Sequence, residues 1–167
     1  MGTAKLQAPT TESIYKLGPD SEPRADVPKG TVTKYRHESK IYGGILRDYY
    51  VYVPAQYDAK KPAALMVFQD GYSYVRNDGD FRVPIVFDNL IHQKAMPVTI
   101  GLFVNPGHFT ADIPENIYRS SNRLAEYDEL SDRYVTFLIT ELIPEIEKKY
   151  TLAQDPKMRA ISGLSSG

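Results

Sequence analysis

Residues 163–167 read Gly-Leu-Ser-Ser-Gly, which is the pattern G-x-S-x-G, and an apolar segment at 157–162 precedes them. This pattern is typical of a tight turn from a strand into a helix, which lifts the central serine above a β-sheet. Its glycines permit a strained backbone and let the following helix approach the strand closely. The sequence therefore predicts a nucleophile elbow, with Ser165 as nucleophile and Gly163 and Gly167 as the elbow glycines.

The segments before this motif follow two different hydrophobic patterns. Residues 31–38 and 46–53 alternate between apolar and polar side chains, and a Gly43-Gly44 pair lies between them. This predicts a hairpin of two half-buried antiparallel strands. Residues 64–68 and 98–104 are unbroken apolar runs, which are typical of parallel strands covered on both faces.

Two segments between the strands have helical spacing. Residues 83–93 place apolar side chains on one helical face, and Pro84 suits the first turn. A longer helix is expected at 129–149, with Asp128 as N-cap and Pro144 bending it or resetting its last turn. Its apolar stripe comprises Leu130, Tyr134, Phe137, Leu138, Leu142 and Ile146.

The order of these elements predicts an α/β fold in which an antiparallel hairpin leads into a parallel sheet with flanking helices. Residues 1–29 contain four prolines among polar side chains and are expected to form a flexible leader, followed by one domain at 30–167. Residues 105–126 are expected to form a long loop, which in a compact domain is usually functional or mobile.

Composition excludes several classes of protein. The 20 basic and 21 acidic side chains are interspersed, which argues against a nucleic-acid partner. The absence of cysteine excludes disulfides and a thiol nucleophile. No two of the three histidines have metal-ligand spacing, and no apolar run approaches the roughly 18 residues of a membrane helix. We therefore expect no metal, no cofactor and no membrane partner. No apolar leader of a signal peptide is visible, so localisation stays open.

A second group of residues can complete an acyl-transfer site. Such a site needs donors for an oxyanion: one amide after the nucleophile and one from the loop after the third strand. Ser166 supplies the first amide, and Asp70-Gly71-Tyr72 directly follows the apolar run 64–68. Asp-Gly is also a common strand-ending turn, but together with the elbow it favours Tyr72 as the second donor.

The chain resembles enterochelin-esterase-like proteins of the esterase D superfamily over roughly residues 27–167. The resemblance rests on the order of several segments: VYVPAQYD at 51–58, FQDG at 68–71, RVPIVFDNLI at 82–91, SNRLAEYD at 121–128, SDRY at 131–134, LIPEI at 142–146 and the terminal ISGLSSG. It implies an α/β-hydrolase fold and serine-dependent hydrolysis of carboxylic esters. Ser165 matches the nucleophile, and Tyr72 and Ser166 match the oxyanion-hole amides.

In α/β-hydrolases the catalytic residues follow the chain order Ser, then Asp or Glu, then His. The acid and the base are therefore expected beyond residue 167, so that the domain is incomplete at the elbow and the 167-residue chain is inactive alone. His108, in the loop at the end of a strand, is the one histidine placed to reach the site, but an exposed loop histidine or a substrate contact is the favoured interpretation.

Arg123 and Glu126 lie three residues apart in the SNRLAEYD segment. They are expected either to pair and brace the loop beside the elbow, with Asp70 and Gly71 as structural support, or to be a solvated pair. Two further functions are compatible with the sequence: a non-catalytic module that binds an ester or glycan through tyrosines, and an acyltransferase. The substrate could be a siderophore lactone, a feruloyl ester on polysaccharide or an acylated sugar.

Overall fold

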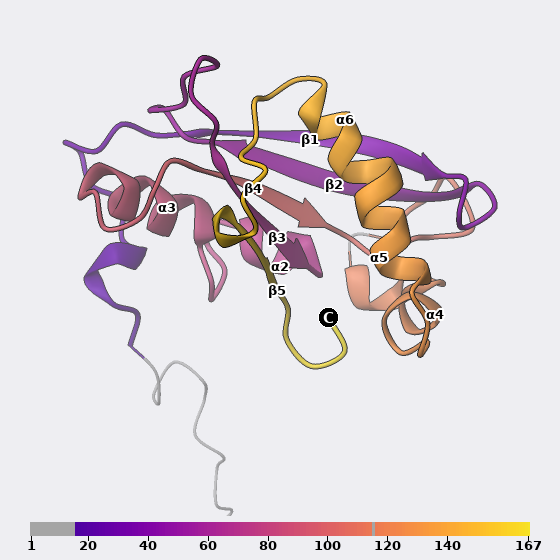
Figure 1. Cartoon of the computed structure of the whole chain (residues 1–167). Coiled ribbons are helices and arrows are strands. Elements are labelled where there is room, and N and C mark those ends of the chain that lie inside the picture. Colours follow the sequence, from indigo (N-terminus) through magenta and orange to yellow (C-terminus); the bar gives the residue numbers. More distant parts are fainter. Residues whose placement is uncertain (1–15, 115) are drawn as a thin grey trace, which may run out of the picture.

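The computed structural model describes residues 16–114 and 116–167. A five-stranded mixed sheet forms its centre, with the strand order β1-β2-β4-β3-β5 (Figure 1). Helices cover both faces of this sheet. The predicted α/β architecture is therefore confirmed.

The five strands join the antiparallel and parallel parts of the sheet. β1 (Thr31–Ser39) pairs antiparallel with β2 (Ile45–Val53), and β2 pairs antiparallel with β4 (Thr99–Val104). β3 (Ala64–Gln69) pairs parallel with both β4 and β5 (Arg159–Ser162). The hairpin thus leads into a parallel sheet, as predicted.

The hairpin strands differ in burial, which corrects one expectation. Gly43 and Gly44 have φ values of 64° and 89°, so they form the predicted turn in a conformation that suits glycine. β1 is mostly exposed at the sheet edge, whereas β2 carries buried side chains on both faces. β2 is not half-buried because it lies between β1 and β4, with helices over both of its sides.

Two helical layers enclose the sheet. α2 (Gly71–Val75) and α3 (Val83–His92) pack on one face around Tyr52, Phe68 and Phe103. A long helical segment packs on the other face around Val51, Leu102 and further buried side chains of the sheet (Figure 1). Pro84 lies in the first turn of α3, as predicted. The described residues also form three 3-10 turns: η1 (Pro19–Ser21), η2 (Ile117–Arg119) and η4 (Pro156–Met158).

The long helical segment differs from the helix expected at 129–149. It consists of α5 (Arg133–Phe137), a π-helical turn η3 (Leu138–Leu142) and α6 (Ile143–Glu147), so it begins after Asp132 and not after Asp128. Leu130 lies outside the helix and is fully exposed. The rest of the predicted stripe is buried or partly buried. The wide π turn precedes Pro144, which lacks an N–H and cannot continue a regular α-helical ladder.

The loop 105–126 is partly helical. It contains η2, and its last residues open the short helix α4 (Arg123–Tyr127). Figure 1 shows this region beside the start of α5 and close to the C-terminal turn. The loop therefore lies where it can support the elbow.

The described part of the expected leader, residues 16–29, contacts the domain. The buried side-chain amide of Asn89 on α3 donates to the backbone oxygens of Asp20 and Glu22, at 2.8 and 2.9 Å. Val27 is buried. Residues 1–15 of the expected flexible leader lie outside the described residues. Within the described ranges, no helix combines the length and apolar character needed to cross a membrane.

Candidate active site

The G-x-S-x-G segment forms a strained turn directly after β5. Ser165 has a φ of 59°, which is rare for a residue with a side chain. The N–H of Gly167 donates to the Leu164 oxygen at 3.1 Å and closes the turn. A Cβ on Gly163 would collide with the backbone of Gly167, so this turn requires glycine at its first position. Strain at the serine and a glycine without room for a side chain are features that the predicted elbow requires.

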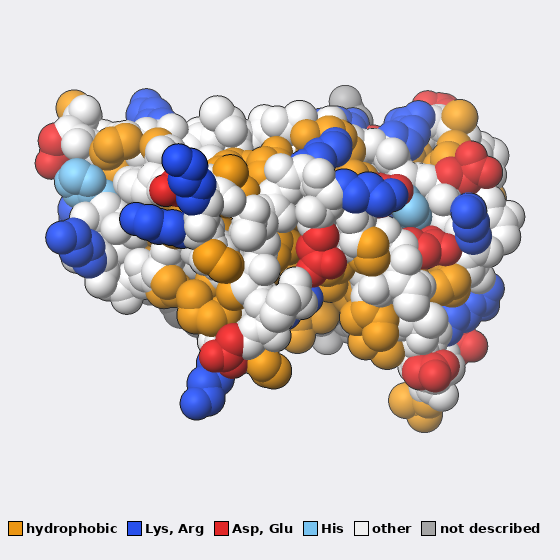
Figure 2. All heavy atoms as spheres, turned by 45° about the horizontal axis from the view of Figure 1, so that its top comes forward, with side chains coloured by type: hydrophobic (Ala, Val, Ile, Leu, Met, Phe, Trp, Pro, Cys, Tyr) orange, Lys and Arg blue, Asp and Glu red, His pale blue; other side chains and the backbone are white. Residues whose placement is uncertain are grey.

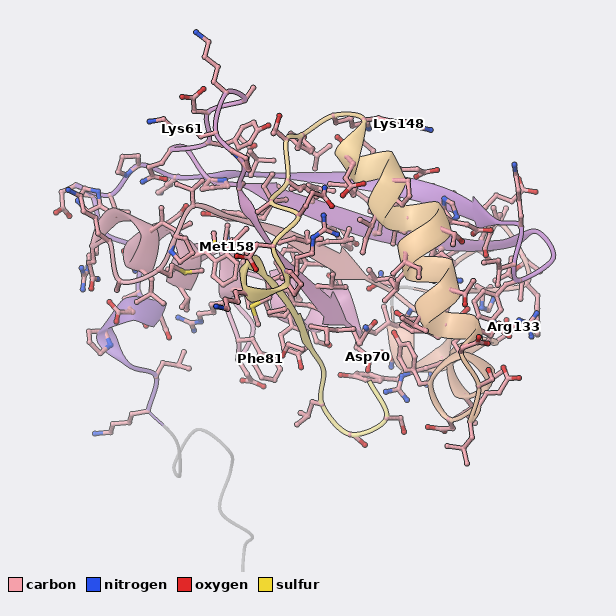
Figure 3. All side chains as sticks on the ribbon, in the orientation of Figure 1. Lys61, Asp70, Phe81, Arg133, Lys148 and Met158 are labelled. Atoms are coloured by element: carbon pink, nitrogen blue, oxygen red, sulfur yellow. The ribbon has the colours of Figure 1, made fainter. Side chains whose placement is uncertain are left out.

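The elbow lies beside the turn that follows β3. A Cβ placed on Gly167 would lie 2.8 Å from Oδ2 of Asp70, which shows how closely the two turns approach. Figure 3 shows Asp70 next to the end of the C-terminal segment. β3 and β5 are adjacent parallel strands, so both turns lie at the same edge of the sheet.

A shallow cavity of about 390 Å³ opens between the elbow and the helices α4 and α5. Ser166, Gly163 and Gly167 line it on the elbow side, and Tyr127 and Tyr134 line it on the helical side. A larger cavity of about 600 Å³ lies away from the elbow, between the N-terminal segment and α3. Of these two cavities, only the smaller one is lined by predicted site residues.

The Asp70 side chain is held in place by Arg123. Its carboxylate accepts two hydrogen bonds from Arg123, from Nε at 2.9 Å and from the second guanidinium nitrogen at 2.6 Å. The guanidinium also lies against the rings of Tyr118 and Tyr127, each 5.3 Å away. Such fork-shaped pairing fixes both orientation and distance, and hydrogen bonding to Asp70 raises the pKa of Arg123.

The expectation that Arg123 pairs with Glu126 is therefore wrong. The two side chains point to different partners, because Glu126 is fully buried against Arg47 of β2. The bonds from Arg47 to the Glu126 carboxylate measure 2.6 and 2.9 Å, and neither side chain has any exposed surface. The Arg47 guanidinium also stacks 4.0 Å from the ring centre of Phe137.

Glu126 accepts further hydrogen bonds from the loop that follows β4. The N–H of Gly107 lies 3.2 Å from Oε1, and the side-chain amide of Asn122 lies 2.7 Å from the same oxygen. A buried carboxylate is stable only when it is paired and hydrogen-bonded. Arg47 and Glu126 therefore fix α4 against β2 and thereby hold Arg123 opposite Asp70.

The turn after β3 is fixed by two further contacts. The N–H of Asp70 donates to the hydroxyl of Tyr127 at 3.2 Å, and the N–H of Tyr72 donates to Oδ1 of Asn105 at 2.8 Å. Gly71 packs so tightly on β4 that a Cβ would collide with the backbone of Phe103 and Val104. The predicted oxyanion donor, the Tyr72 N–H, is therefore engaged by Asn105 in this structure.

The tyrosines around the site remain neutral hydroxyls. Burial, followed by the charge of Asp70, raises the pKa of Tyr127. Burial also raises the pKa of Tyr134, whose hydroxyl donates to Oε1 of Gln69. Both hydroxyls can thus act as hydrogen-bond donors and acceptors near neutral pH.

A second cleft, of about 570 Å³, lies on the other side of the elbow. Its walls include Tyr72, Phe81, Tyr118 and Leu164, and the last two side chains are 61% and 65% exposed. The hydroxyls of Ser73 and Tyr118 meet at 3.0 Å within it. The cleft combines an apolar, partly aromatic wall with a few hydroxyl groups, as ligand sites often do.

The histidines are engaged elsewhere. Nδ1 of His108 accepts a hydrogen bond from the N–H of Ser121 at 3.0 Å, and His37 lies between Glu141 and Glu145. His92 is the exposed last residue of α3. In the described part of the chain none of the three hydrogen-bonds to Ser165.

Charge on the molecule is mixed. Figure 2 shows basic and acidic side chains interspersed over the visible face without one large patch of either sign. Among residues 16–114 and 116–167, no three His, Asp or Glu side chains are grouped to hold a metal ion.

A mixed sheet whose parallel part ends in a G-x-S-x-G turn defines the class of α/β-hydrolases. The family model described as "Putative esterase" matches residues 46–167, which is most of the chain. The chain therefore belongs to this esterase family.

Several solved structures share the fold of this chain. A ferulic acid esterase from the anaerobic fungus Anaeromyces mucronatus superposes with a TM-score of 0.63 at 20% identity, covering 88% of this chain and 54% of that one. The ferric enterobactin esterase from Salmonella typhimurium gives a TM-score of 0.66 at 18% identity, covering 90% and 34%. An enterobactin esterase from Shigella flexneri gives 0.64 at 14% identity, covering 88% and 32%. The chain thus spans about half the length of the first structure and one third of the other two.

Proposed function

We propose that the protein hydrolyses carboxylic esters, that it belongs to the enterochelin-esterase-like group, and that Ser165 is its nucleophile. The observation that carries this proposal is the positive φ of Ser165 in a turn that requires glycine at Gly163. Ser165 would attack the ester carbonyl, and the N–H groups of Ser166 and Tyr72 would donate to the oxyanion. Asp70, Gly71, Arg123 and Glu126 would hold the donor turn in place. No cofactor or metal is needed for this chemistry.

The general base and its acid are proposed to lie outside these 167 residues. The placement of His37, His92 and His108 supports this, since each is engaged or exposed away from Ser165. A serine without its base retains only residual catalysis from the oxyanion hole and binding. The 167-residue chain alone should therefore be inactive, and only the whole protein should turn over substrate.

An aromatic carboxylic ester is the substrate class that the second cleft supports best. Tyr72, Phe81 and Tyr118 offer ring surfaces beside the elbow, and aromatic groups stack well on such surfaces. A structure of the similar ferulic acid esterase is a complex with ferulic acid. One of the enterobactin esterase structures was determined in the presence of 2,3-dihydroxy-N-benzoyl-glycine. Both compounds carry an aromatic ring, which favours an aromatic substrate for this protein as well.

Site-directed variants of the whole protein test the nucleophile. Ser165→Ala should lower kcat for a p-nitrophenyl ester by at least about 10³-fold. Ser162→Ala, at the end of β5, should keep most of the activity. Equal losses from the two changes would show that the elbow has been assigned to the wrong serine.

The cleft is tested by substrate choice. Tyr118→Ala should lower kcat/KM for benzoyl esters by about tenfold, the value of one aromatic contact, and leave acetyl esters nearly unchanged. Phe109→Ala is the matched control, because Phe109 is also an exposed aromatic residue but does not line the cleft. Equal effects of Tyr118→Ala on both ester types would argue against an aromatic subsite.

A further inference from the structure

Asn105 belongs to none of the sequence motifs of the site, yet its side chain accepts a hydrogen bond from Tyr72, the predicted oxyanion donor. It directly follows β4, is 3% exposed, and places Oδ1 2.8 Å from the N–H of Tyr72. Its own N–H donates to the backbone oxygen of Asp48 on β2 at 3.3 Å. The side chain is thus anchored in the sheet while its end reaches the turn after β3.

The orientation of this side-chain amide follows from its partner. Because a backbone N–H can only donate, the Asn105 atom that faces it must be the carbonyl oxygen and not the NH₂ group. A single N–H makes one short, linear hydrogen bond. An ester oxygen that reaches the Tyr72 N–H must therefore displace Oδ1 of Asn105.

We propose that Asn105 is a positioning residue that occupies the Tyr72 amide in the unliganded enzyme and gives it up to the oxyanion during the reaction. The proposal rests on the proposed function and adds a residue that withholds the Tyr72 amide from the bound ester. Asn105 keeps the N–H of Tyr72 paired until substrate enters.

The outcome of this exchange follows from the strengths of the competing acceptors. The carbonyl oxygen of a bound ester is a neutral acceptor much like Oδ1 of Asn105, so exchanging one for the other gains little. The oxyanion of the tetrahedral intermediate is charged, and charge-assisted hydrogen bonds are roughly twice as strong as neutral ones. The exchange therefore gains little for the bound ester and more for the oxyanion. Because Asn105 must be displaced in both states, it weakens both by about the same amount and acts on KM more than on kcat.

Two substitutions should act in opposite directions. In Asn105→Ala the Tyr72 N–H is left without its competitor, so substrate and transition state both gain affinity. KM should then fall about fivefold, while kcat changes by less than about twofold. In Asn105→Asp, which has nearly the same shape, a charged acceptor holds the N–H and repels the oxyanion. Its kcat should fall by at least about tenfold. Asn77→Ala, at an exposed loop position, is the control and should change neither constant.

A purely structural role of Asn105 predicts a different pattern. Loss of a structural contact misplaces the turn, so Asn105→Ala would raise KM or lower kcat, and either result would overturn the proposal. If Asn105→Ala folds poorly, as judged by circular dichroism, Asn105→Asp alone decides: unchanged kcat in that variant rejects the proposal.

Amide hydrogen exchange measured by NMR tests the contact without relying on catalysis. In the unliganded wild-type protein the Tyr72 amide should exchange slowly, and in Asn105→Ala it should exchange at least about tenfold faster. Ser165→Ala should leave its exchange unchanged. Equal exchange in wild type and Asn105→Ala would overturn the proposal even if the enzyme is active. If the Tyr72 amide is protected as expected but ester hydrolysis survives Ser165→Ala, the result would count against Ser165 as nucleophile and not against the role of Asn105.

Discussion

The turn after β3 and the turn after β5 lie side by side, but they are held in different ways. Side chains of Arg123, Tyr127 and Asn105 hydrogen-bond the first turn from α4 and from the end of β4. The elbow is closed by its own backbone, through the bond from Gly167 to Leu164, and its neighbours Ile161 and Leu164 are 62% and 65% exposed. The position of the first turn therefore depends on packed partners, whereas that of the second depends on its own backbone and its glycines.

Mutations in the two turns should therefore have different effects on activity and stability. In the elbow, added volume should remove activity while leaving the described domain folded. In the first turn, lost contacts should weaken both the fold and the site, because the same residues serve both.

The largest effect is expected at Gly163 in the elbow. Gly163→Val places a side chain against the backbone of Gly167, so the turn cannot form and kcat/KM of the whole protein should fall by at least about 10³-fold. Thermal unfolding followed by circular dichroism should change little. Gly18→Ala is the matched control, since nothing lies within 4 Å of the added Cβ. A large drop in Tm for Gly163→Val would mean that the elbow supports the fold as well.

A smaller effect is expected for the buried ion pair behind the first turn. Glu126→Ala leaves Arg47 buried without its partner and should lower the free energy of unfolding by about 3–5 kcal/mol. Replacing both residues, as in Arg47→Met with Glu126→Leu, should restore most of that loss, because no unpaired charge remains. Urea denaturation measures both. If the double variant is as unstable as the single one, the hydrogen bonds to Gly107 and Asn122 carry the stability and not the ion pair.

Loss of the Arg123–Asp70 pair should lower the free energy of unfolding more modestly. Arg123→Ala removes two charge-assisted hydrogen bonds between side chains that are 14% and 5% exposed, which should cost about 1–3 kcal/mol of unfolding free energy. Arg76→Ala breaks the exposed pair with Asp78 and should cost much less, as expected for two solvated side chains. Equal costs for the two variants would show that the first turn is no better anchored than the surface.

The smallest effect concerns pH and the contact between η3 and the β1–β2 hairpin. Burial opposes ionisation of Glu141, but hydrogen bonds from His37, from the Ile41 N–H and from Ser39 outweigh it and lower its pKa. A lowered pKa in the folded state stabilises the protein above the ordinary glutamate pKa of about 4.3, and this contribution is lost as pH falls below it. Glu141→Gln should therefore lose stability at pH 7 and show a weaker dependence on pH in the acid range. A parallel pH profile for the two proteins would contradict this assignment.

Much of this arrangement follows from local sequence. Alternation predicts β1 and β2, and the apolar runs predict β3 and β4. The G-x-S-x-G pattern predicts the strand before it, β5, and a strained turn at Ser165. Arg47 could also have been found, since alternation places it on the same face of β2 as the buried Tyr49 and Val51. An arginine on that face needs a buried acidic partner.

The partners themselves could not be predicted from the sequence. Arg123 lies three residues from Glu126, yet its partner is Asp70, 53 residues away, because α4 turns the two side chains toward different strands. Asn105 directly follows β4, and a polar residue at the end of a buried strand is common. Only the packing of β4 against the turn after β3 shows that the Asn105 side chain reaches Tyr72. Local patterns thus predict the elements, while tertiary packing determines which side chains meet.

Labelling by a fluorophosphonate is the most direct test of the central claim that Ser165 is an activated nucleophile. The whole protein would be treated with the probe, digested and analysed by peptide mass spectrometry, with the Ser165→Ala variant in parallel. We expect a single adduct on Ser165 in the wild-type protein, loss of ester hydrolysis in step with labelling, and no adduct in the variant. An adduct on another residue, or hydrolysis that persists when Ser165 is fully labelled, would contradict the claim.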